Sequence, residues 1–271
     1  MKLLLIGHTE RYPVEQLQMQ LFASEPSEFV TAPFAKGENG AVSSLFTGKT
    51  YVTATAKITW NGKTGRAAKR LLREQADVRH TRRLLQQSYY LAAMQLLDTV
   101  PPWGALSGVR PSKLSTKALL AGKTRRQAER ELEREFFVTP ERAKLCVDAS
   151  EHTVEAMNLL APRDLSVYIG IPFCPTRCAY CSFVSESVER FGEFLPPYLD
   201  CLLREVEYTG KLLRQSGWHV RTLYMGGGTP TTLSAEQMAR LLEAVNTQFD
   251  LSRCLEFTVE GGRPDTLDAE K

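Results

Sequence analysis

The first 61 residues contain several short hydrophobic segments typical of strands, and in one of them hydrophobic and polar residues alternate with the period of two of a half-buried strand. The alternation is clearest around Thr53 and Thr55, which lie among apolar and β-branched neighbours. Gly48 marks an expected hairpin turn between two of these segments. The pattern predicts strands at Lys2–Ile6, Phe29–Ala32, Val42–Phe46 and Tyr51–Trp60.

From Gly65 the hydrophobic residues recur at helical spacing with arginines between them, which predicts a long helical run. Pro101 ends this run, because proline does not continue a helix. A loop at Trp103–Lys113 and three short helices ending near Leu160 are expected next. Residues 1–160 are therefore expected to form a small α+β domain. Ser112 and Thr139 are expected to be N-caps of two of these helices, and Pro140 is expected in the first turn of a helix.

Strands then alternate with helices, after an expected domain boundary at residues 161–164. This order predicts parallel strands joined by right-handed crossovers in a second domain, residues 164–271. Each predicted strand leads into an unusual loop, and such loops share the C-terminal edge of a parallel sheet, where ligands bind. The expected strands are Leu165–Ile171, Arg221–Met225 and Leu255–Val259, and the expected helices are Phe194–Gln215 and Ala235–Phe249, the second capped by Ser234. The three loops are Cys174–Cys181, Gly226–Pro230 and Glu260–Pro264.

Three of the six cysteines fall within eight residues, at Cys174, Cys178 and Cys181. Three thiolates satisfy three irons of a [4Fe–4S] cluster and leave the fourth iron open to another ligand. A structural zinc site needs a fourth protein ligand, and no histidine lies nearby. Three buried structural cysteines are the plain alternative, which their polar loop disfavours. The spacing therefore predicts an iron–sulfur site with an open position.

Composition and charge narrow the class of protein. A hydrophobic content of 43% and a charged content of 24% are those of an ordinary globular protein. No apolar run approaches the roughly 18–20 residues of a membrane span, and the apolar opening is too short for a signal peptide, so a cytoplasmic protein is expected. Residues 63–134 hold 16 Lys and Arg against 6 Asp and Glu. This basic segment could contact nucleic acid or a small polyanion, or form solvated helix faces.

The sequence resembles the radical SAM (S-adenosylmethionine) superfamily, and within it the oxygen-independent coproporphyrinogen oxidase group, in particular the HemZ-like coproporphyrinogen dehydrogenases. The resemblance is based on three segments: Tyr168-Ile-Gly-Ile-Pro-Phe through Phe183, Leu223-Tyr-Met-Gly-Gly-Gly-Thr-Pro230, and Glu256-Phe-Thr-Val-Glu260. It implies the first half of a partial (β/α)6 TIM-like barrel after the α+β domain. Because the barrel would need about twice the strands predicted after residue 164, the chain is interpreted as truncated.

The resemblance also implies which residues bind the cofactors. Cys174, Cys178 and Cys181 would hold a [4Fe–4S] cluster whose fourth iron chelates SAM. Tyr180 would lie against the adenine, and Glu260 would hydrogen-bond the ribose. Tyr168 would lie beside the cluster or SAM, although by sequence alone it is equally a core tyrosine, and Glu260 alone is a solvated strand-end carboxylate. The backbone expected to meet the SAM amino group is that of Gly226, Gly227, Gly228 and Thr229.

The implied activity is oxidative decarboxylation of coproporphyrinogen III through a 5′-deoxyadenosyl radical, with an external flavodoxin-like or ferredoxin-like electron donor. The catalytic residues for the porphyrinogen reaction are not predicted. The better-known oxidases have His at Gly170 and Cys at Phe183, and the haem-chaperone branch shares the Phe. Two alternatives therefore stay open: a non-enzymatic haem carrier, and a radical SAM enzyme that acts on tRNA through the basic segment.

Overall fold

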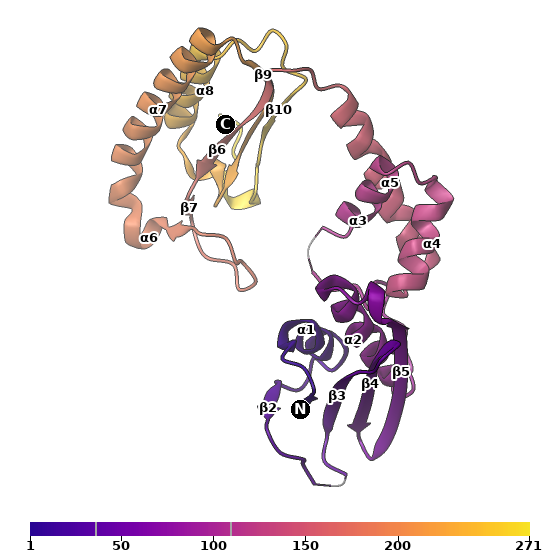
Figure 1. Cartoon of the computed structure of the whole chain (residues 1–271). Helices are drawn as coiled ribbons and strands as arrows, with labels where there is room; N and C mark the ends of the chain where they lie inside the picture. Colours follow the sequence, from indigo (N-terminus) through magenta and orange to yellow (C-terminus); the bar gives the residue numbers. More distant parts are fainter. Residues whose placement is uncertain (36, 109) are drawn as a thin grey trace. The chain divides into compact units, whose positions relative to one another are not determined.

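The computed structural model describes residues 1–35, 37–108 and 110–271 and divides into two compact units, Met1–Asn158 and Leu159–Lys271 (Figure 1). The first unit begins with a five-stranded sheet of order β2-β1-β3-β4-β5. β1 is parallel to both neighbours, and β4 is antiparallel to its neighbours β3 and β5. The strands are β1 (Lys2–Ile6), β2 (Glu28–Val30), β3 (Gly40–Thr47), β4 (Tyr51–Trp60) and β5 (Lys63–Leu72).

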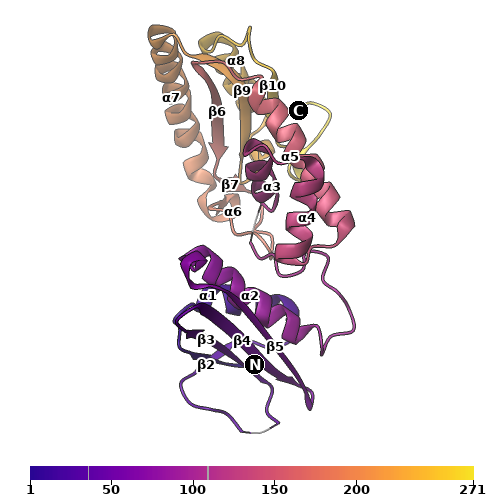
Figure 2. The ribbon, with the colours of Figure 1, turned by 45° about the vertical axis from the view of Figure 1, so that its right-hand side comes forward.

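Two helices, α1 (Arg11–Leu21) and α2 (Val78–Ala93), share the hydrophobic core of this sheet (Figure 2). The core includes Val14 and Leu17 from α1, and Leu85 and Tyr89 from α2. Tyr89 is fully buried, and its hydroxyl donates to Gln18 Oε1 at 3.0 Å. The α+β character of this region therefore agrees with the expectation, although α1 was not among the expected helices.

The helical run expected from Gly65 is confirmed over α2, but it is wrong over residues 65–72, which belong to the strand β5. Asn61 and Gly62 have φ values of 48° and 76°, and Trp60 pairs directly with Lys63. An Asn-Gly pair with left-handed φ at both positions makes the two-residue turn that suits a twisted hairpin. Pairing with β4 along the whole of β5 therefore places Leu71 and Leu72 in a strand and not in the helical run that follows. The turn expected at Gly48 is confirmed, with its N–H donating to Tyr51 O at 2.8 Å.

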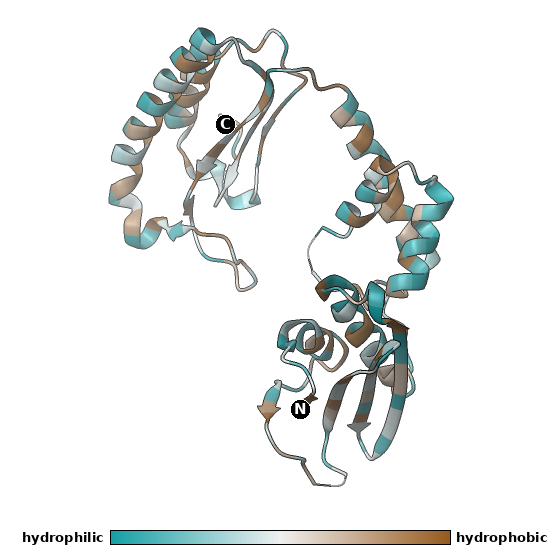
Figure 3. Ribbon diagram, in the orientation of Figure 1, coloured by the Kyte–Doolittle hydropathy of each residue, from teal (hydrophilic) through white to brown (hydrophobic). Residues whose placement is uncertain are grey.

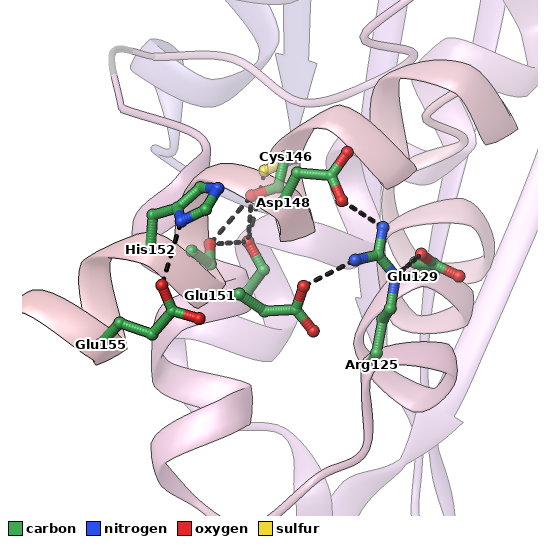
Figure 4. Close-up of polar contacts among 9 residues, drawn as sticks. Arg125, Glu129, Cys146, Asp148, Glu151, His152 and Glu155 are labelled. Atoms are coloured by element: carbon green, nitrogen blue, oxygen red, sulfur yellow. Dashed lines mark hydrogen bonds and ion pairs between the residues drawn. The ribbon is translucent and has the colours of Figure 1, made fainter.

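Three helices complete the first unit: α3 (Ser112–Leu120), α4 (Arg125–Phe136) and α5 (Pro140–Asn158). Arg125 connects α4 to α5, because its guanidinium contacts Glu129 on its own helix and Asp148 and Glu151 on α5 (Figure 4). Ser112 is the first residue of α3 and makes no side-chain capping bond, so its expected role as an N-cap is wrong. Pro140 begins α5 as expected.

The second unit contains a parallel sheet of order β10-β9-β6. Its strands, β6 (Asp164–Ile171), β9 (His219–Gly227) and β10 (Glu256–Val259), fall where the sequence places them. The helices α7 (Leu195–Ser216) and α8 (Ala235–Gln248) lie together on one face and share one core with the strands (Figure 1). Ser234 caps α8 in a capping box, as expected. Short elements complete the unit: β7 (Phe173–Cys174), β8 (Glu186–Ser187) and α6 (Val188–Phe191).

Alternation along the strands of the second unit separates two faces of the sheet. Ile169, Leu223 and Met225 are buried against the helices, and Figure 3 shows hydrophobic turns recurring along α7 and α8. Tyr168 and Tyr224 point to the opposite face and are 63% and 37% exposed. The parallel α/β unit agrees with the expected fold class, and the partial barrel stays a prediction.

Candidate functional site: three loops at one sheet edge

The three loops singled out in the sequence meet at the C-terminal edge of the β10-β9-β6 sheet. Ile171 of β6 pairs with Gly227 of β9, and Val259 of β10 pairs with Met225. Beyond the strands, the N–H of Gly228 donates to Ile171 O at 2.7 Å, and the N–H of Glu260 donates to Met225 O at 3.0 Å. Parallel pairing therefore brings the cysteine loop, the glycine turn and Glu260 together, as the strand order predicts.

The cysteine loop leaves the sheet through β7. Cys174 is buried at 8% exposure, whereas Cys178 and Cys181 are half-buried and joined by a turn in which Cys181 N–H donates to Cys178 O at 3.0 Å. Among residues 1–35, 37–108 and 110–271, no group of three or more Cys, His, Asp or Glu side chains is gathered closely enough to hold a metal ion. The donor set is nevertheless that of an iron–sulfur cluster, since all three side chains are thiols in one loop. Their role as ligands stays a prediction.

The glycine turn packs directly against the first cysteine. A Cβ on Gly228 would lie 2.7 Å from Phe173 O and 3.0 Å from Cys174 Sγ, so a side chain there would displace the loop. Thr229 is buried at 3% exposure, and its hydroxyl donates to Cys174 Sγ at 3.4 Å. The side chain of Thr229 contacts Cys174, and the expected contact between its backbone and SAM stays a prediction.

The remaining glycines of the turn have different reasons to lack a side chain. Gly227 has a φ of 111°, which favours glycine, and its Cβ position lies 2.9 Å from Ile171 O. A Cβ on Gly226 would lie 3.1 Å from Glu260 Oε2 and 2.9 Å from the Tyr224 ring. The N–H groups of Gly228 and Thr229 already donate to Ile171 and Phe173 carbonyls. The amino group of SAM donates hydrogen bonds through its N–H groups, so at this turn its partners would be carbonyl oxygens.

Tyr168, Tyr224 and Glu260 form one group on the open face of the sheet. Tyr168 pairs with Tyr224 across β6 and β9, and their rings are stacked with centroids 6.0 Å apart and planes 10° apart. The Tyr224 hydroxyl donates to Glu260 Oε1. This bond to the carboxylate raises the pKa of Tyr224, since losing the phenolic proton would place two negative charges together. Tyr224 was not among the expected site residues, but its place two residues before Gly226 puts both on this face.

Tyr180 and Arg263 lie at the second cysteine. Tyr180 is 89% exposed, and a hydrogen bond with the Cys178 side chain raises the pKa of its phenol. Arg263 follows Glu260 by three residues, and its Nη1 lies 3.8 Å from Cys178 Sγ. A bidentate bond to Asp265 raises the pKa of the Arg263 guanidinium and lowers that of the Asp265 carboxyl. Arg263 was also not among the expected site residues. Its position three residues after Glu260 is the feature of the sequence that could have indicated it.

The basic segment lines a groove of about 750 Å³ in the first unit, between β5, α2 and α4. Two of its cations are paired with acids of α4, Arg83 with Glu135 at 3.1 Å and Lys123 with Glu131 at 2.5 Å. The other lysines and arginines that line the groove are Lys69, Arg70, Arg130 and Arg134. The groove agrees with any of the polyanions considered from the sequence, so contact with nucleic acid stays a prediction.

No family model matches this chain. The chain is 39% identical over 172 residues to the oxygen-independent coproporphyrinogen-III oxidase-like protein HemZ of Bacillus subtilis, a match that covers 62% of this chain and 34% of that protein. It is 37% identical over 119 residues to anaerobilin synthase of Escherichia coli O157:H7, covering 43% and 26%. It is 40% identical over 103 residues to the heme chaperone HemW of Lactococcus lactis, covering 38% and 25%. The chain therefore spans between about a quarter and a third of the length of these relatives.

A solved structure of coproporphyrinogen III oxidase (HemN) from Escherichia coli, described as a radical SAM enzyme, aligns with a TM-score of 0.32 and 30% identity over 40% of this chain and 24% of that chain. The sequence matches show that the chain is homologous to part of HemZ, of HemW and of an oxygen-independent coproporphyrinogen III oxidase of Escherichia coli. HemZ and HemW have different described roles. No helix in the part of the chain that the structure describes is long and apolar enough to cross a membrane.

Proposed function

We propose that this chain carries the cluster-binding and SAM-binding half of a radical SAM oxidoreductase acting on a tetrapyrrole, most simply coproporphyrinogen III. The observation that supports this best is the meeting of three loops at one sheet edge, where the glycine turn contacts Cys174 on one side and Glu260 on the other. A site that binds only a metal ion has no use for a strand-end carboxylate beside a glycine backbone. A ligand that carries a nucleotide and also binds the cluster would use the carboxylate for its ribose and the glycine backbone for close approach.

In this proposal Cys174, Cys178 and Cys181 hold the cluster. Bound there, the cluster and SAM would supply radical chemistry for the oxidative decarboxylation of a propionate side chain, with the electron coming from an external flavodoxin-like or ferredoxin-like donor. The chain's own residues orient and shield the ligand. Glu260 accepts hydrogen bonds from the ribose, Tyr168 shields the ligand on the open face, and Tyr224 orients the Glu260 carboxylate through its hydroxyl.

The experiment that tests the proposal is anaerobic reconstitution with iron and sulfide, followed by iron analysis and absorption spectroscopy. The wild-type chain should take up an oxygen-sensitive [4Fe–4S] cluster. Cys174→Ala, Cys178→Ala and Cys181→Ala should each abolish it, because three thiolates are the minimum protein ligand set. A stoichiometric zinc ion in the purified wild type would overturn the proposal.

Two cysteines of the same unit are matched controls. Cys201 is exposed on α7 and Cys254 is half-buried before β10, so Cys201→Ala and Cys254→Ala should retain the cluster. Cys146 is a control of a different kind, because it is buried in the helical core of the other unit and burial raises its thiol pKa. Cys146→Ala should retain the cluster but lower the stability of its own unit.

The second candidate is a haem carrier, which the 40% identity to a heme chaperone favours. A carrier should bind haem stoichiometrically, without consuming SAM. The two candidates differ in one measurement, the formation of 5′-deoxyadenosine when reductant, SAM and coproporphyrinogen are supplied to a chain that includes the complete barrel. Haem binding with no 5′-deoxyadenosine would favour the carrier.

A further inference from the structure

Arg263 reaches from the loop after β10 across to the cysteine loop. Its Nη1 donates to Thr176 Oγ1 at 2.8 Å and lies 3.5 Å from Thr176 O, and the same nitrogen is 3.8 Å from Cys178 Sγ. These contacts join residues 87 and 85 positions apart in the sequence. One guanidinium therefore contacts both the backbone of the loop and the second of its three thiols.

The Arg263 side chain is itself held on its other edge. Its Nε and Nη2 donate to the two carboxylate oxygens of Asp265 at 2.8 and 2.6 Å, a bidentate geometry that fixes the plane of the guanidinium. The backbone is fixed as well, because Thr266 Oγ1 donates to Arg263 O at 2.8 Å and bonds Thr231 Oγ1 at 2.6 Å. Thr231 and Thr266 are both buried, so this attachment is shielded from water.

We propose that Arg263 is a positioning residue of the cluster: it fixes the Thr176–Cys178 part of the loop and keeps a permanent positive charge beside the Cys178 sulfur. This inference rests on the proposed function, since it concerns the same cluster. A guanidinium suits the role because it stays charged at any working pH and presents donors on two edges at once.

The charge has a definite effect on a redox cluster. Reduction adds one electron, so a cation a few ångströms from a ligating sulfur stabilises the reduced form more than the oxidised form. Replacing Arg263 with methionine removes the charge and the donors but keeps an unbranched apolar side chain. The midpoint potential of an Arg263→Met cluster should therefore be more negative than that of the wild type. Arg263→Lys should lie between them, because it keeps the charge and loses the bidentate bond to Asp265.

The positioning role has a test that needs no cluster. In the metal-free chain, Arg263→Met should raise the rate of tryptic cleavage after Arg177 several-fold, because the neighbouring Thr176 backbone and hydroxyl lose their partner. Arg263 precedes Pro264 and is a poor tryptic site, so the substitution itself removes little cleavage. Arg253→Met is the matched control, an arginine of the same unit whose backbone carbonyl accepts a hydrogen bond from Arg221 Nη1 at 3.1 Å.

The two measurements separate the inference from the proposed function. If the wild-type chain takes up no iron, the proposed cluster is wrong. If Arg263→Met still accelerates cleavage after Arg177 in that case, Arg263 nevertheless fixes the cysteine loop. A reconstituted Arg263→Met chain with wild-type potential would overturn the role of the charge. Cleavage at Arg177 equal to that of Arg253→Met would overturn the positioning role.

Discussion

At the residue scale, the ligand-facing chemistry depends on which side chains share the open face of the sheet. Glu260 lies one residue beyond β10, and register places it beside Tyr224, whose hydroxyl donates to it. That bond orients the Glu260 carboxylate and occupies one lone pair of Oε1. The other lone pairs of the carboxylate can accept hydrogen bonds from ribose hydroxyls. Tyr224 is therefore expected to act through Glu260 and not on SAM directly.

Glu260→Gln should weaken SAM binding by about 1.5–3 kcal/mol, the range for a hydrogen bond to a charged group. Tyr224→Phe should weaken it by only about 0.5–1.5 kcal/mol, because the carboxylate stays and loses only its orientation. Equilibrium dialysis with labelled SAM on the reconstituted chain measures both. Tyr208→Phe, an exposed tyrosine on α7, is the control and should bind normally. Equal losses for Tyr224→Phe and Tyr208→Phe would exclude the positioning by Tyr224.

Alanine substitutions at Gly226 and Gly228 should impair two different functions, SAM binding and cluster uptake. Gly228→Ala places a methyl group against Phe173 O and Cys174 Sγ, so cluster uptake should fall. Gly226→Ala crowds Glu260 and Tyr224, so SAM binding should fall while iron content is kept. Gly170→Ala is the control, because its Cβ would meet only the Tyr168 ring, at an ordinary 3.4 Å. Iron analysis and SAM binding together measure these effects, and identical behaviour of all three variants would contradict the assignment.

At the element scale, the β4–β5 hairpin shows how a short turn decides the structure of a whole segment. Leu71 and Leu72 were expected to begin the helical run that continues in α2, but residues 63–72 form a strand because the Asn61-Gly62 turn folds them back on β4. Gly65 fits this arrangement closely, since its Cβ position lies 2.1 Å from Ala92 O of α2. The turn and this close contact together place α2 against the sheet.

Gly62→Ala should destabilise the first unit by about 1–2 kcal/mol, the cost of a left-handed conformation for an ordinary residue. The Cβ position of Gly62 has no neighbour within 4 Å, so the loss comes from φ alone and not from a clash. Gly62→Asn should lose less, because asparagine tolerates this conformation. Urea unfolding followed by circular dichroism measures the difference. A Gly62→Ala chain as stable as the wild type would contradict the turn geometry.

At the scale of the whole molecule, the two units have separate hydrophobic cores. Within the described residues of Leu159–Lys271, α7 and α8 cover one face of the β10-β9-β6 sheet, and that face buries Leu223 and Met225 completely. Tyr168 lies on the opposite face and is 63% exposed, and Tyr180 in the cysteine loop is 89% exposed. A reactive radical on this face would be in contact with water, which undermines control of the reaction.

The 271-residue chain by itself should therefore give no catalytic turnover. An anaerobic assay with reductant, SAM and coproporphyrinogen should yield neither 5′-deoxyadenosine in excess of enzyme nor decarboxylated porphyrinogen. Cluster uptake in the same preparation is the control that separates an open site from an unfolded one. Catalytic formation of protoporphyrinogen by this chain would show that the open face is sufficient for the reaction.

The sequence by itself determined the features that depend on local pattern. The alternation of strands and helices after residue 164, the Ser234 cap and the three loops at strand ends could all be predicted, because periodicity, capping and parallel topology leave little choice. The choice of cysteines as cluster ligands also came from spacing alone, and it stays a prediction. The hairpin turn at Asn61-Gly62 was present in the sequence too, but helical spacing of the leucines hid it.

Only the tertiary structure decided which side chains contact one another across the sheet edge. Thr229 turns onto Cys174, Tyr224 donates to Glu260, and Arg263 reaches Cys178 from 85 residues away. Such contacts depend on strand register and loop path, because a shift of one residue moves every side chain to the other face of the sheet. No local pattern in the sequence carries that information, and it becomes available only when the parallel strands are aligned.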